Sequence, residues 1–204
     1  MTLAVSDTSI ETDRLLLRRI TAADFPFYAR IHADPDVARY IGYGRPRSGE
    51  ETRVWLDRIM ECYETFQLGQ LAVVRKLDGA LIGRCGIAYL AVETNPADGV
   101  DPRGYFVPGE APDGVTTHLE PELGYTFDRA AWGQGFAREA AGAVFGYFRA
   151  LRKGDRIVSV IHPDNVRSKR LAQSLGAVLV DRVRAFDTVH DCFAWPVMEA
   201  PLRP

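Results

Sequence analysis

Hydrophobic and polar positions follow two different periods along the chain. In residues 48–66 the apolar side chains recur every three to four positions, which is the spacing of one helix face. That face consists of Val54, Trp55, Ile59 and Tyr63. In residues 70–92 the pattern changes to two apolar runs separated by Asp78-Gly79, which predicts a β-hairpin.

Two capping boxes predict where helices begin in the first third of the chain. In each, a hydroxyl residue precedes an acidic residue by three positions, so both side chains can bond amide groups that a helix start leaves unpaired. The two pairs are Thr21 with Asp24 and Ser48 with Glu51. Residues 11–20, before the first box, read as an opening strand.

The second half of the chain alternates strands with helices. Residues 122–127 and 156–162 predict strands, each followed by a helix, and a closing strand pair comes last. The first of these helices opens near Gly135 and places five residues on one face: Phe136, Ala140, Val144, Phe145 and Phe148. Strand–helix units between two antiparallel pairs predict an α/β (α+β) fold, a mixed sheet with helices on both faces.

Residues 93–121 lack a steady period. They are rich in Pro, Gly and Asp, and we interpret them as a long loop that is functional or mobile. The acidic residues of this loop can attract a cationic amine, which makes it a candidate lid. A merely solvated loop is the alternative.

Composition narrows the class of protein. The chain has 204 residues, a formal net charge of −2 and 47% hydrophobic residues, which suits one globular domain. This balance gives no sign of nucleic-acid or membrane-surface binding, and neither a secretory signal nor a membrane-spanning run is expected. Cys62, Cys85 and Cys192 have no metal-ligand spacing, so we expect no metal and buried free thiols in a reducing cytoplasm.

The stretch "WGQGFAREA", residues 132–140, is the first candidate for chemistry. A dinucleotide fingerprint needs a third glycine where Arg138 stands, and a P-loop needs Gly-Lys-Ser/Thr, so both nucleotide motifs fail and a nicotinamide oxidoreductase is excluded. Glycines before a helix still let backbone N–H groups approach an anion closely. Anion binding and a plain structural turn both remain open on this spacing.

A second candidate follows the strand at 156–162. Asn165 and Ser168 lie three positions apart at the start of the helix, so they share one of its faces. Asn165 is also a good helix cap, and capping alone is the alternative to a ligand contact.

Together these stretches resemble a known family. "ELGYTF", "WGQGFAREA" and "HPDNVRSKRLAQSLGA", with an opening strand of the form T-x-R-L-x-L-R, resemble the GNAT acetyltransferases, in particular the RimJ/RimL-like branch of ribosomal-protein-alanine N-acetyltransferases. The resemblance covers residues 9–199 and implies one GNAT domain with a central, mostly antiparallel twisted sheet and an insertion loop at about 93–121. It also implies acetyl-CoA as co-substrate, no metal and a cytoplasmic location.

The resemblance also assigns cofactor-binding residues. The strand end Tyr125, Thr126 and Phe127 would pair with the pantetheine arm, and Asn165 with Ser168 would meet the cofactor from the second helix. Amides of the turn would hold the pyrophosphate, which implicates Trp132, Gly133, Gln134, Gly135, Phe136, Ala137 and Arg138. Ala130 departs from the family pattern, which has Arg or Gln there, and this removes one polar contact. Further candidate phosphate partners are Arg129 and Lys169.

Acetyl transfer to an amine needs a base, because the amine must be neutral to attack, and a donor to the departing thiolate. Glu122 is the candidate base because the resembled branch often carries a carboxylate there, and Ser168 is the candidate donor. Glu120 and His118 are rival bases.

The acceptor stays open between a protein N-terminal amine and a small-molecule amine. Its pocket has four aromatic candidates, Tyr40, Trp55, Tyr89 and Tyr105, for which a core position is the alternative. The resemblance implies that the protein can form a homodimer. We expect neither a nucleic acid nor a membrane as a partner. A non-catalytic acyl-CoA-binding or regulatory protein of the same fold is the competing functional class.

Overall fold

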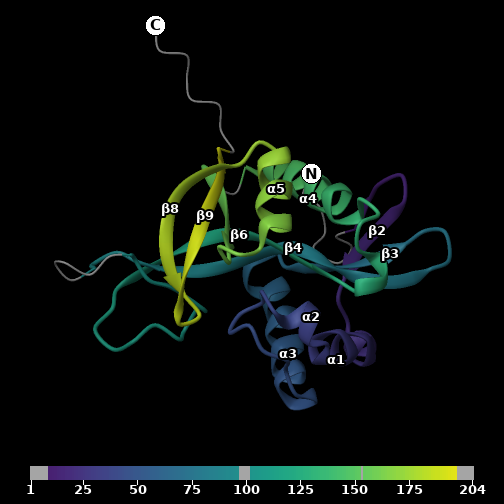
Figure 1. The fold of residues 1–204 in the computed structure, drawn as a ribbon, viewed down its shortest axis with the longest axis horizontal. Helices are drawn as coiled ribbons and strands as arrows, with labels where there is room; N and C mark the ends of the chain where they lie inside the picture. The colour runs from purple at the N-terminus through teal and green to yellow at the C-terminus, as the bar shows by residue number, and fades with distance from the viewer. Residues whose placement is uncertain (1–8, 97–101, 153, 197–204) are drawn as a thin grey trace, which may run out of the picture. The chain divides into compact units, whose positions relative to one another are not determined.

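The computed structural model describes residues 9–96, 102–152 and 154–196 (Figure 1). The chain divides into two compact units: residues up to 88 with 124–147, and residues 89–123 with those from 148 onwards. Three elements contribute to both: β4 (Ala80–Glu93), β6 (Thr117–Phe127) and α4 (Phe136–Leu151). Each unit is described below by itself.

Besides β4 and β6, the strands are β1 (Ile10–Glu11), β2 (Leu15–Arg19), β3 (Gln70–Arg75), β5 (Tyr105–Phe106), β7 (Arg156–Ile161), β8 (Val178–Ala185) and β9 (Thr188–Pro196). They follow the hydrogen-bonded order β1-β2-β3-β4-β6-β7-β9-β8, and β5 pairs with β4. The pairings β1–β2, β2–β3, β3–β4, β4–β5, β7–β9 and β8–β9 are antiparallel, whereas β6–β7 is parallel. The predicted mixed, mostly antiparallel sheet is therefore confirmed.

The first unit begins with an antiparallel set of strands: β1 (Ile10–Glu11), β2 (Leu15–Arg19), β3 (Gln70–Arg75) and the first part of β4. Leu15 and Leu17 alternate with polar or half-exposed neighbours along β2 and are fully buried, as expected for a strand with one core face. The predicted β3–β4 hairpin is present, and its turn spans residues 76–79, which include Asp78 and Gly79.

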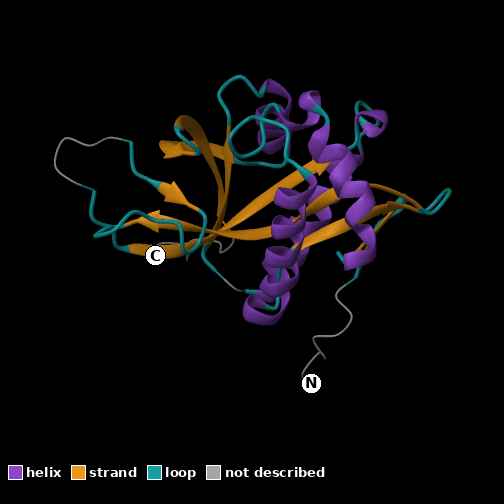
Figure 2. Ribbon diagram, turned by 90° about the horizontal axis from the view of Figure 1, so that it is seen from below, coloured by secondary structure: helices purple, strands orange, loops and turns teal. Residues whose placement is uncertain are grey.

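Helices cover this part of the sheet on both faces. The 3-10 helix η2 and helices α1 to α3 lie on one side and the start of α4 on the other (Figures 1 and 2). Their bounds are η2 (Ala22–Asp24), α1 (Phe25–Ala33), α2 (Pro35–Ala38) and α3 (Gly49–Phe66). The buried Tyr63 of α3 ties its helix to the sheet, because its hydroxyl donates to Gln70 O and accepts from Ile20 N–H.

Both predicted capping boxes are present at helix starts. The Asp24 carboxylate accepts from the Thr21 N–H at 2.9 Å. Ser48 Oγ accepts from the Glu51 N–H at 3.1 Å, and the Glu51 carboxylate accepts from the Ser48 N–H at 2.8 Å. Short-range sequence patterns alone are therefore sufficient to place these two helix starts.

The second unit is built around the remaining strands and one helix. They are β5 (Tyr105–Phe106), β7 (Arg156–Ile161), α5 (Val166–Ser174), β8 (Val178–Ala185) and β9 (Thr188–Pro196). Its core is one cluster of buried residues: Leu90, Val92, Tyr105, Val158, Val183, Ala185, Cys192 and Ala194. Trp195 of β9 is also buried and donates its indole N–H to Leu175 O at 3.0 Å, which ties the end of α5 to the sheet.

Two sequence predictions were wrong in detail. Val54 is 50% exposed, because the buried face of α3 passes through Thr52 and Leu56 instead. The segment 93–121 is not a loop throughout: it holds β5, and β6 begins at Thr117 rather than at residue 122. Its Pro-, Gly- and Asp-rich composition predicts a loop, because these strands are stabilised by pairing with distant strands and not by local sequence preferences.

Among the described residues, no helix is long and apolar enough to cross a membrane. The same residues contain no group of His, Cys, Asp or Glu side chains that is suited to hold a metal ion. Cys85 and Cys192 are buried and Cys62 is partly buried, and all three thiols are free; burial raises the pKa of each.

Candidate functional site

The candidate site of the first unit lies where β6 ends and α4 begins. The Asp128 N–H donates to Ile82 O at 2.9 Å, and the chain then turns through the 3-10 helix η3 (Arg129–Ala131). The Trp132 indole N–H donates back to Phe127 O at 2.9 Å. This bond ties the turn to the strand end and engages the Phe127 carbonyl, which was expected to face the pantetheine arm.

The two glycines of the turn adopt a backbone conformation that other residues avoid. Gly133 has φ +74° and Gly135 has φ +80°, both in the left-handed region. A Cβ at Gly133 would meet no atom within 4 Å, so the turn is open to solvent there. The left-handed backbone conformation of this tight turn therefore favours glycine at both positions. The absence of side chains there also leaves the backbone accessible to a ligand.

The backbone N–H groups of this turn point at no protein acceptor. Within the described residues, no N–H from Gly133 to Arg138 has a protein acceptor, and the first bond of this turn runs from Glu139 N–H to Gly135 O at 3.1 Å. A helix start normally satisfies such groups with a capping side chain or a ligand. The helix dipole adds partial positive charge there, so this turn is suited to bind an anion.

A polar network holds the turn in place from the connection between β1 and β2. Glu139, in the first turn of α4, accepts from Thr12 Oγ1 at 2.6 Å, from Arg14 N–H at 3.0 Å and from Arg14 Nε at 2.6 Å. Arg14 also donates to Gln134 O at 3.0 Å, and its guanidinium lies 4.6 Å from the Phe136 ring centroid. Burial alone would raise the pKa of the Glu139 carboxyl, but the hydrogen bonds from Thr12 and Arg14 outweigh it and lower the pKa.

This network was missed at the level of sequence. Arg14 belongs to the opening T-x-R-L-x-L-R motif and Glu139 to "WGQGFAREA", and the two are 125 positions apart. The available signal was an acidic residue in the first turn of a helix that has no capping side chain. Its partner followed only from tertiary structure.

The other residues of the turn and of the strand end differ in whether their side chains form hydrogen bonds within the described residues. Gln134 Nε2 donates to Ala130 O at 2.7 Å, so this side chain braces the turn rather than extending away from it. Ala137 is half-buried on α4, and Tyr125 is half-buried on β6. The Thr126 hydroxyl is buried and has no hydrogen-bond partner within the described residues, so the strand end carries an unused donor.

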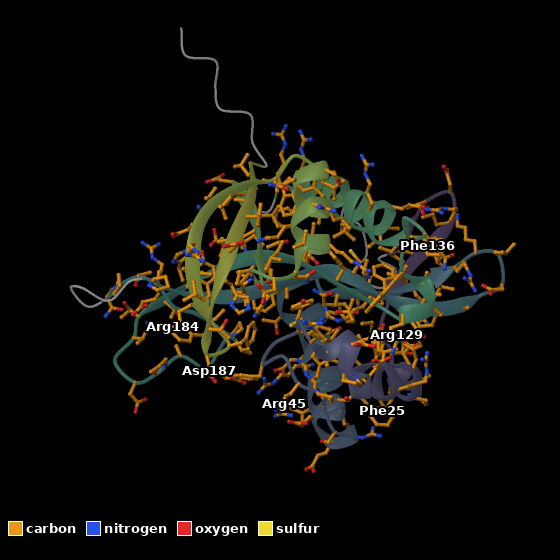
Figure 3. The ribbon with its side chains drawn as sticks, in the orientation of Figure 1. Phe25, Arg45, Arg129, Phe136, Arg184 and Asp187 are labelled. Atoms are coloured by element: carbon orange, nitrogen blue, oxygen red, sulfur yellow. The ribbon has the colours of Figure 1, made fainter. Side chains whose placement is uncertain are left out.

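The three basic candidates differ in their partners. Arg129 pairs with Asp36 at 2.7 Å and with Asp34 at 3.7 Å, which places it against α2 (Figure 3). Lys169 pairs with Asp191 at 3.1 Å. Arg138 is exposed and has no ion-pair partner in the described part of the chain, so it is the basic side chain most available to a phosphate.

The candidate base and its rivals lie on β6. Glu122 belongs to the second unit, is partly exposed, and is registered opposite Val158 of β7. Its carboxylate accepts from the Val160 N–H at 3.4 Å. The rival Glu120 is buried and bound by Arg156 and by the Tyr105 hydroxyl, which commits its carboxylate to a structural pair. His118 is on β6 rather than on the expected loop, and it is exposed.

Asn165 and Ser168 also belong to the second unit, at the start of α5. Asn165 Oδ1 accepts from the Ser168 N–H at 3.2 Å, which is the capping bond anticipated as the alternative to a ligand contact. Both side chains are partly exposed.

The aromatic acceptor candidates separate by burial. Tyr105 is 4% exposed and bonded to Glu120, so it is a core residue. Tyr40, Trp55 and Tyr89 are partly exposed. Trp55 lies in the first unit, between the rings of Tyr28 and His32 and the guanidinium of Arg84.

Comparison with known proteins agrees with this arrangement. Residues 14–178 match the family model of the acetyltransferase (GNAT) domain. A relative from Bacillus licheniformis, named as the uncharacterized N-acetyltransferase p20, is 24% identical over 167 residues, 82% of this chain and 80% of p20.

Solved structures share the fold. An acetyltransferase from Agrobacterium tumefaciens superposes with a TM-score of 0.70 at 24% identity, over 96% of this chain and 98% of that one. RimL, titled as the ribosomal L7/L12 alpha-N-protein acetyltransferase in complex with coenzyme A, superposes with a TM-score of 0.67 at 14% identity, over 93% and 98%. Because the matched domain spans most of the sequence, the chain belongs to the GNAT acetyltransferase family.

Proposed function

We propose that this protein is an N-acetyltransferase that transfers the acetyl group of acetyl-CoA directly to a primary amine. The observation that carries the proposal is the turn from Gly133 to Arg138, whose backbone N–H groups have no protein acceptor within the described residues. Coenzyme A carries a diphosphate, and a glycine turn at a helix start fits that group. Membership of the GNAT family supports the same chemistry.

The proposed cofactor contacts follow from this fit. N–H groups from Gly133 to Arg138 bind the diphosphate, and the Arg138 guanidinium adds a charge-assisted contact. The buried Thr126 hydroxyl and the β6 strand end meet the pantetheine arm. Asn165 contributes its amide N–H₂, since its oxygen already caps α5. The absent side chain at Ala130 matters little when main-chain amides carry most of the binding.

The proposed chemistry uses two residues of the second unit. Acetyl-CoA supplies an activated thioester. Glu122, directly or through a water, takes a proton from the ammonium of the acceptor, so that the amine nitrogen can bond to the acetyl carbon. As the carbon–sulfur bond breaks, the amine nitrogen loses its second proton to solvent, and the Ser168 hydroxyl donates a proton to the thiolate and regains one from solvent. Holding both substrates together supplies part of the roughly 7–11 kcal/mol available from proximity.

The acceptor is a protein N-terminal amine or a small-molecule amine. RimL, by its title, acetylates the α-amine of a ribosomal protein, which favours a peptide N-terminus. The partly exposed aromatic residues near α1 and α3 are equally suited to a small amine.

A thiol-release assay with acetyl-CoA against peptides, amino acids, polyamines and aminoglycosides tests the proposal. Glu122→Gln should lower kcat about 100-fold or more, because general-base catalysis contributes about 10²–10⁴. The Kd for acetyl-CoA should stay within about twofold. Glu120→Gln serves as the matched carboxylate control on the same strand, and it should lower stability while leaving kcat of the folded protein near that of the wild type.

Two outcomes would count against the proposal. Coenzyme A that produces no thermal stabilisation of the wild type would remove the cofactor assignment. Tight acetyl-CoA binding without turnover of any amine would favour the non-catalytic acyl-CoA-binding alternative.

A further inference from the structure

A cluster of basic side chains lies between α1, α3 and β4 in the first unit. We call it the basic cluster and define it as His32 of α1, Arg47 before α3, and Arg84 of β4, gathered around Trp55. The His32 and Trp55 ring centroids are 4.6 Å apart, and the Arg84 guanidinium lies 5.4 Å from the Trp55 ring. Arg47 joins through its N–H, which donates to His32 O at 3.0 Å.

Two buried donors of the basic cluster have no protein acceptor. His32 is 2% exposed, its Nδ1 lies 3.3 Å from Thr52 Oγ1, and its Nε2 has no partner among the described residues. The tautomer in which Thr52 donates to Nδ1 presents a proton at Nε2. The Arg47 Nη1 is likewise buried without a partner in the described part of the chain. Leaving such groups unpaired is costly, which indicates a partner outside the protein chain.

The charges around the cluster are unbalanced. Glu51 is the carboxylate that acts on Arg47, but it is bound by Arg45 at 2.6 Å and by the Ser48 N–H. Arg45, labelled in Figure 3, lies at the end of α3 that carries Glu51. Burial, then Arg84 and Arg47, lower the pKa of His32 to about 3, so the imidazole is neutral at physiological pH. The charges of Arg47 and Arg84 both act on His32, and the Glu51 carboxylate that acts on Arg47 is already bound by Arg45.

Within the first unit, the cluster lies next to the part of β6 that begins at Gly124. A Cβ built on Gly124 of β6 would lie 3.3 Å from Gln70 Nε2 and 3.9 Å from Arg84 Nη1, and Gln70 Oε1 accepts from Arg84 at 2.8 Å. Arg47, Trp55 and Arg84 are partly exposed, so part of the cluster is at the surface, whereas the unpaired His32 Nε2 and Arg47 Nη1 atoms are buried.

We propose that the basic cluster binds a carboxylate of the amine acceptor, with His32 Nε2–H and the Arg47 guanidinium donating to its two oxygens. The acceptor is then an amine that also bears a carboxylate, such as an amino acid or an acidic peptide N-terminus. This inference rests on the proposed N-acetyltransferase function. Two donors match two carboxylate oxygens, and a guanidinium is the side chain best shaped for that group.

The test compares matched acceptors in the thiol-release assay. Free amino acids are paired with their carboxamides, and peptides with N-terminal Glu are paired with those with Gln. The wild type should use the carboxylate member about 10-fold or more better in kcat/KM, the loss expected when a charged hydrogen bond is removed. Arg47→Met should abolish this preference through KM, with kcat and the Kd for acetyl-CoA unchanged.

Controls separate this loss from misfolding. Arg53→Gln removes an exposed arginine of α3 that lies outside the cluster, and it should leave the preference intact. Arg47→Lys keeps the positive charge but lacks the planar guanidinium, so it should retain an intermediate preference for the carboxylate acceptor. It also serves if Arg47→Met does not fold.

The outcomes distinguish this inference from the proposed function. Equal use of carboxylate and carboxamide acceptors, or an Arg47→Met variant that slows both alike, would overturn the carboxylate site and leave the acetyltransferase standing. Absence of turnover would instead overturn the proposed function. In that case, thermal stabilisation of the CoA-bound protein by an amino acid but not by its amide, and its loss in Arg47→Met, would still support the site; no such difference would overturn it.

Discussion

Helices α4 and α5 each follow a strand of the sheet, but they differ in how the backbone N–H groups of their first turns are hydrogen-bonded. At the start of α5, Asn165 Oδ1 accepts from the Ser168 N–H, so a side chain of the chain itself caps the helix. At the start of α4, glycines at φ +74° and +80° lead into the helix, and N–H groups from Gly133 to Arg138 have no acceptor within the described residues.

The difference shows what marks an anion site. A helix start alone is common, and most are closed by Ser, Thr, Asp or Asn. The α4 start differs because its cap is missing, while Arg14 holds its geometry from outside the helix through bonds to Glu139 and Gln134 O. A helix start that is rigid but uncapped is suited to bind a diphosphate, whereas a capped one is already satisfied.

The largest expected effect comes from a matched pair of glycine variants. Gly133→Ala and Gly176→Ala each place a methyl on a left-handed residue where no atom lies within 4 Å, so both should cost about 1–2 kcal/mol of stability. Only Gly133→Ala should also weaken coenzyme A binding, by about 10-fold or more, because the backbone N–H groups of the α4 turn would no longer point at the diphosphate. Calorimetric titration measures the affinity. Equal affinity in the two variants would contradict a diphosphate site at the α4 turn.

The next effect concerns the external brace. Glu139→Gln removes the charge that holds Arg14 and should lower the free energy of unfolding by about 1–2 kcal/mol at pH 7. The pKa of Glu139 is lowered from the usual 4.5, so the folded state favours the ionised carboxylate. Its contribution is full above pH 4.5 and is lost as the pH falls through the lowered pKa.

Urea melts at pH 7 and at pH 3 measure this contribution. The difference between wild type and Glu139→Gln should shrink at the lower pH. Glu64→Gln is the control, because Glu64 is 79% exposed and forms only a 3.7 Å ion pair. A constant gap between wild type and Glu139→Gln would mean that the carboxylate does not brace the turn.

The smallest effect tests the capped helix. Asn165→Ala should lower stability by about 1 kcal/mol, whereas Asn165→Asp should keep the cap, since Asp is as good an N-cap as Asn. If Asn165 also contacts the cofactor through its N–H₂, Asn165→Asp should weaken coenzyme A binding a few-fold at unchanged stability. Unchanged affinity in both variants would restrict Asn165 to capping.

Much of the fold was predictable because it depends on short-range patterns. The capping box at Ser48, the hairpin turn at Asp78-Gly79 and the helix after Gly135 all follow from residues within a few positions of one another. The extension of β6 back to Thr117 was not predictable. Its residues include Pro121 and three charged or polar side chains, and their pairing depends on distant strands.

The candidate site divides in the same way. The glycine turn and the pair of Asn165 with Ser168 were found from sequence, and their roles toward a cofactor remain predictions. The commitment of Arg129 to Asp36 and of Lys169 to Asp191 was not visible, because charges say nothing about their partners until the chain is folded.

The sequence by itself therefore determined the order of most elements, the glycines that the α4 turn requires and the resemblance to the GNAT family, but not β5 or the start of β6. Local backbone preferences and side-chain periods are enough for these. Only the tertiary structure decided that Arg14 braces Glu139 across 125 positions, that Glu120 is committed to Arg156, and that His32 and Arg47 keep buried donors without a protein acceptor within the described residues. Those features depend on which distant side chains the folded chain brings together, and no local pattern encodes that.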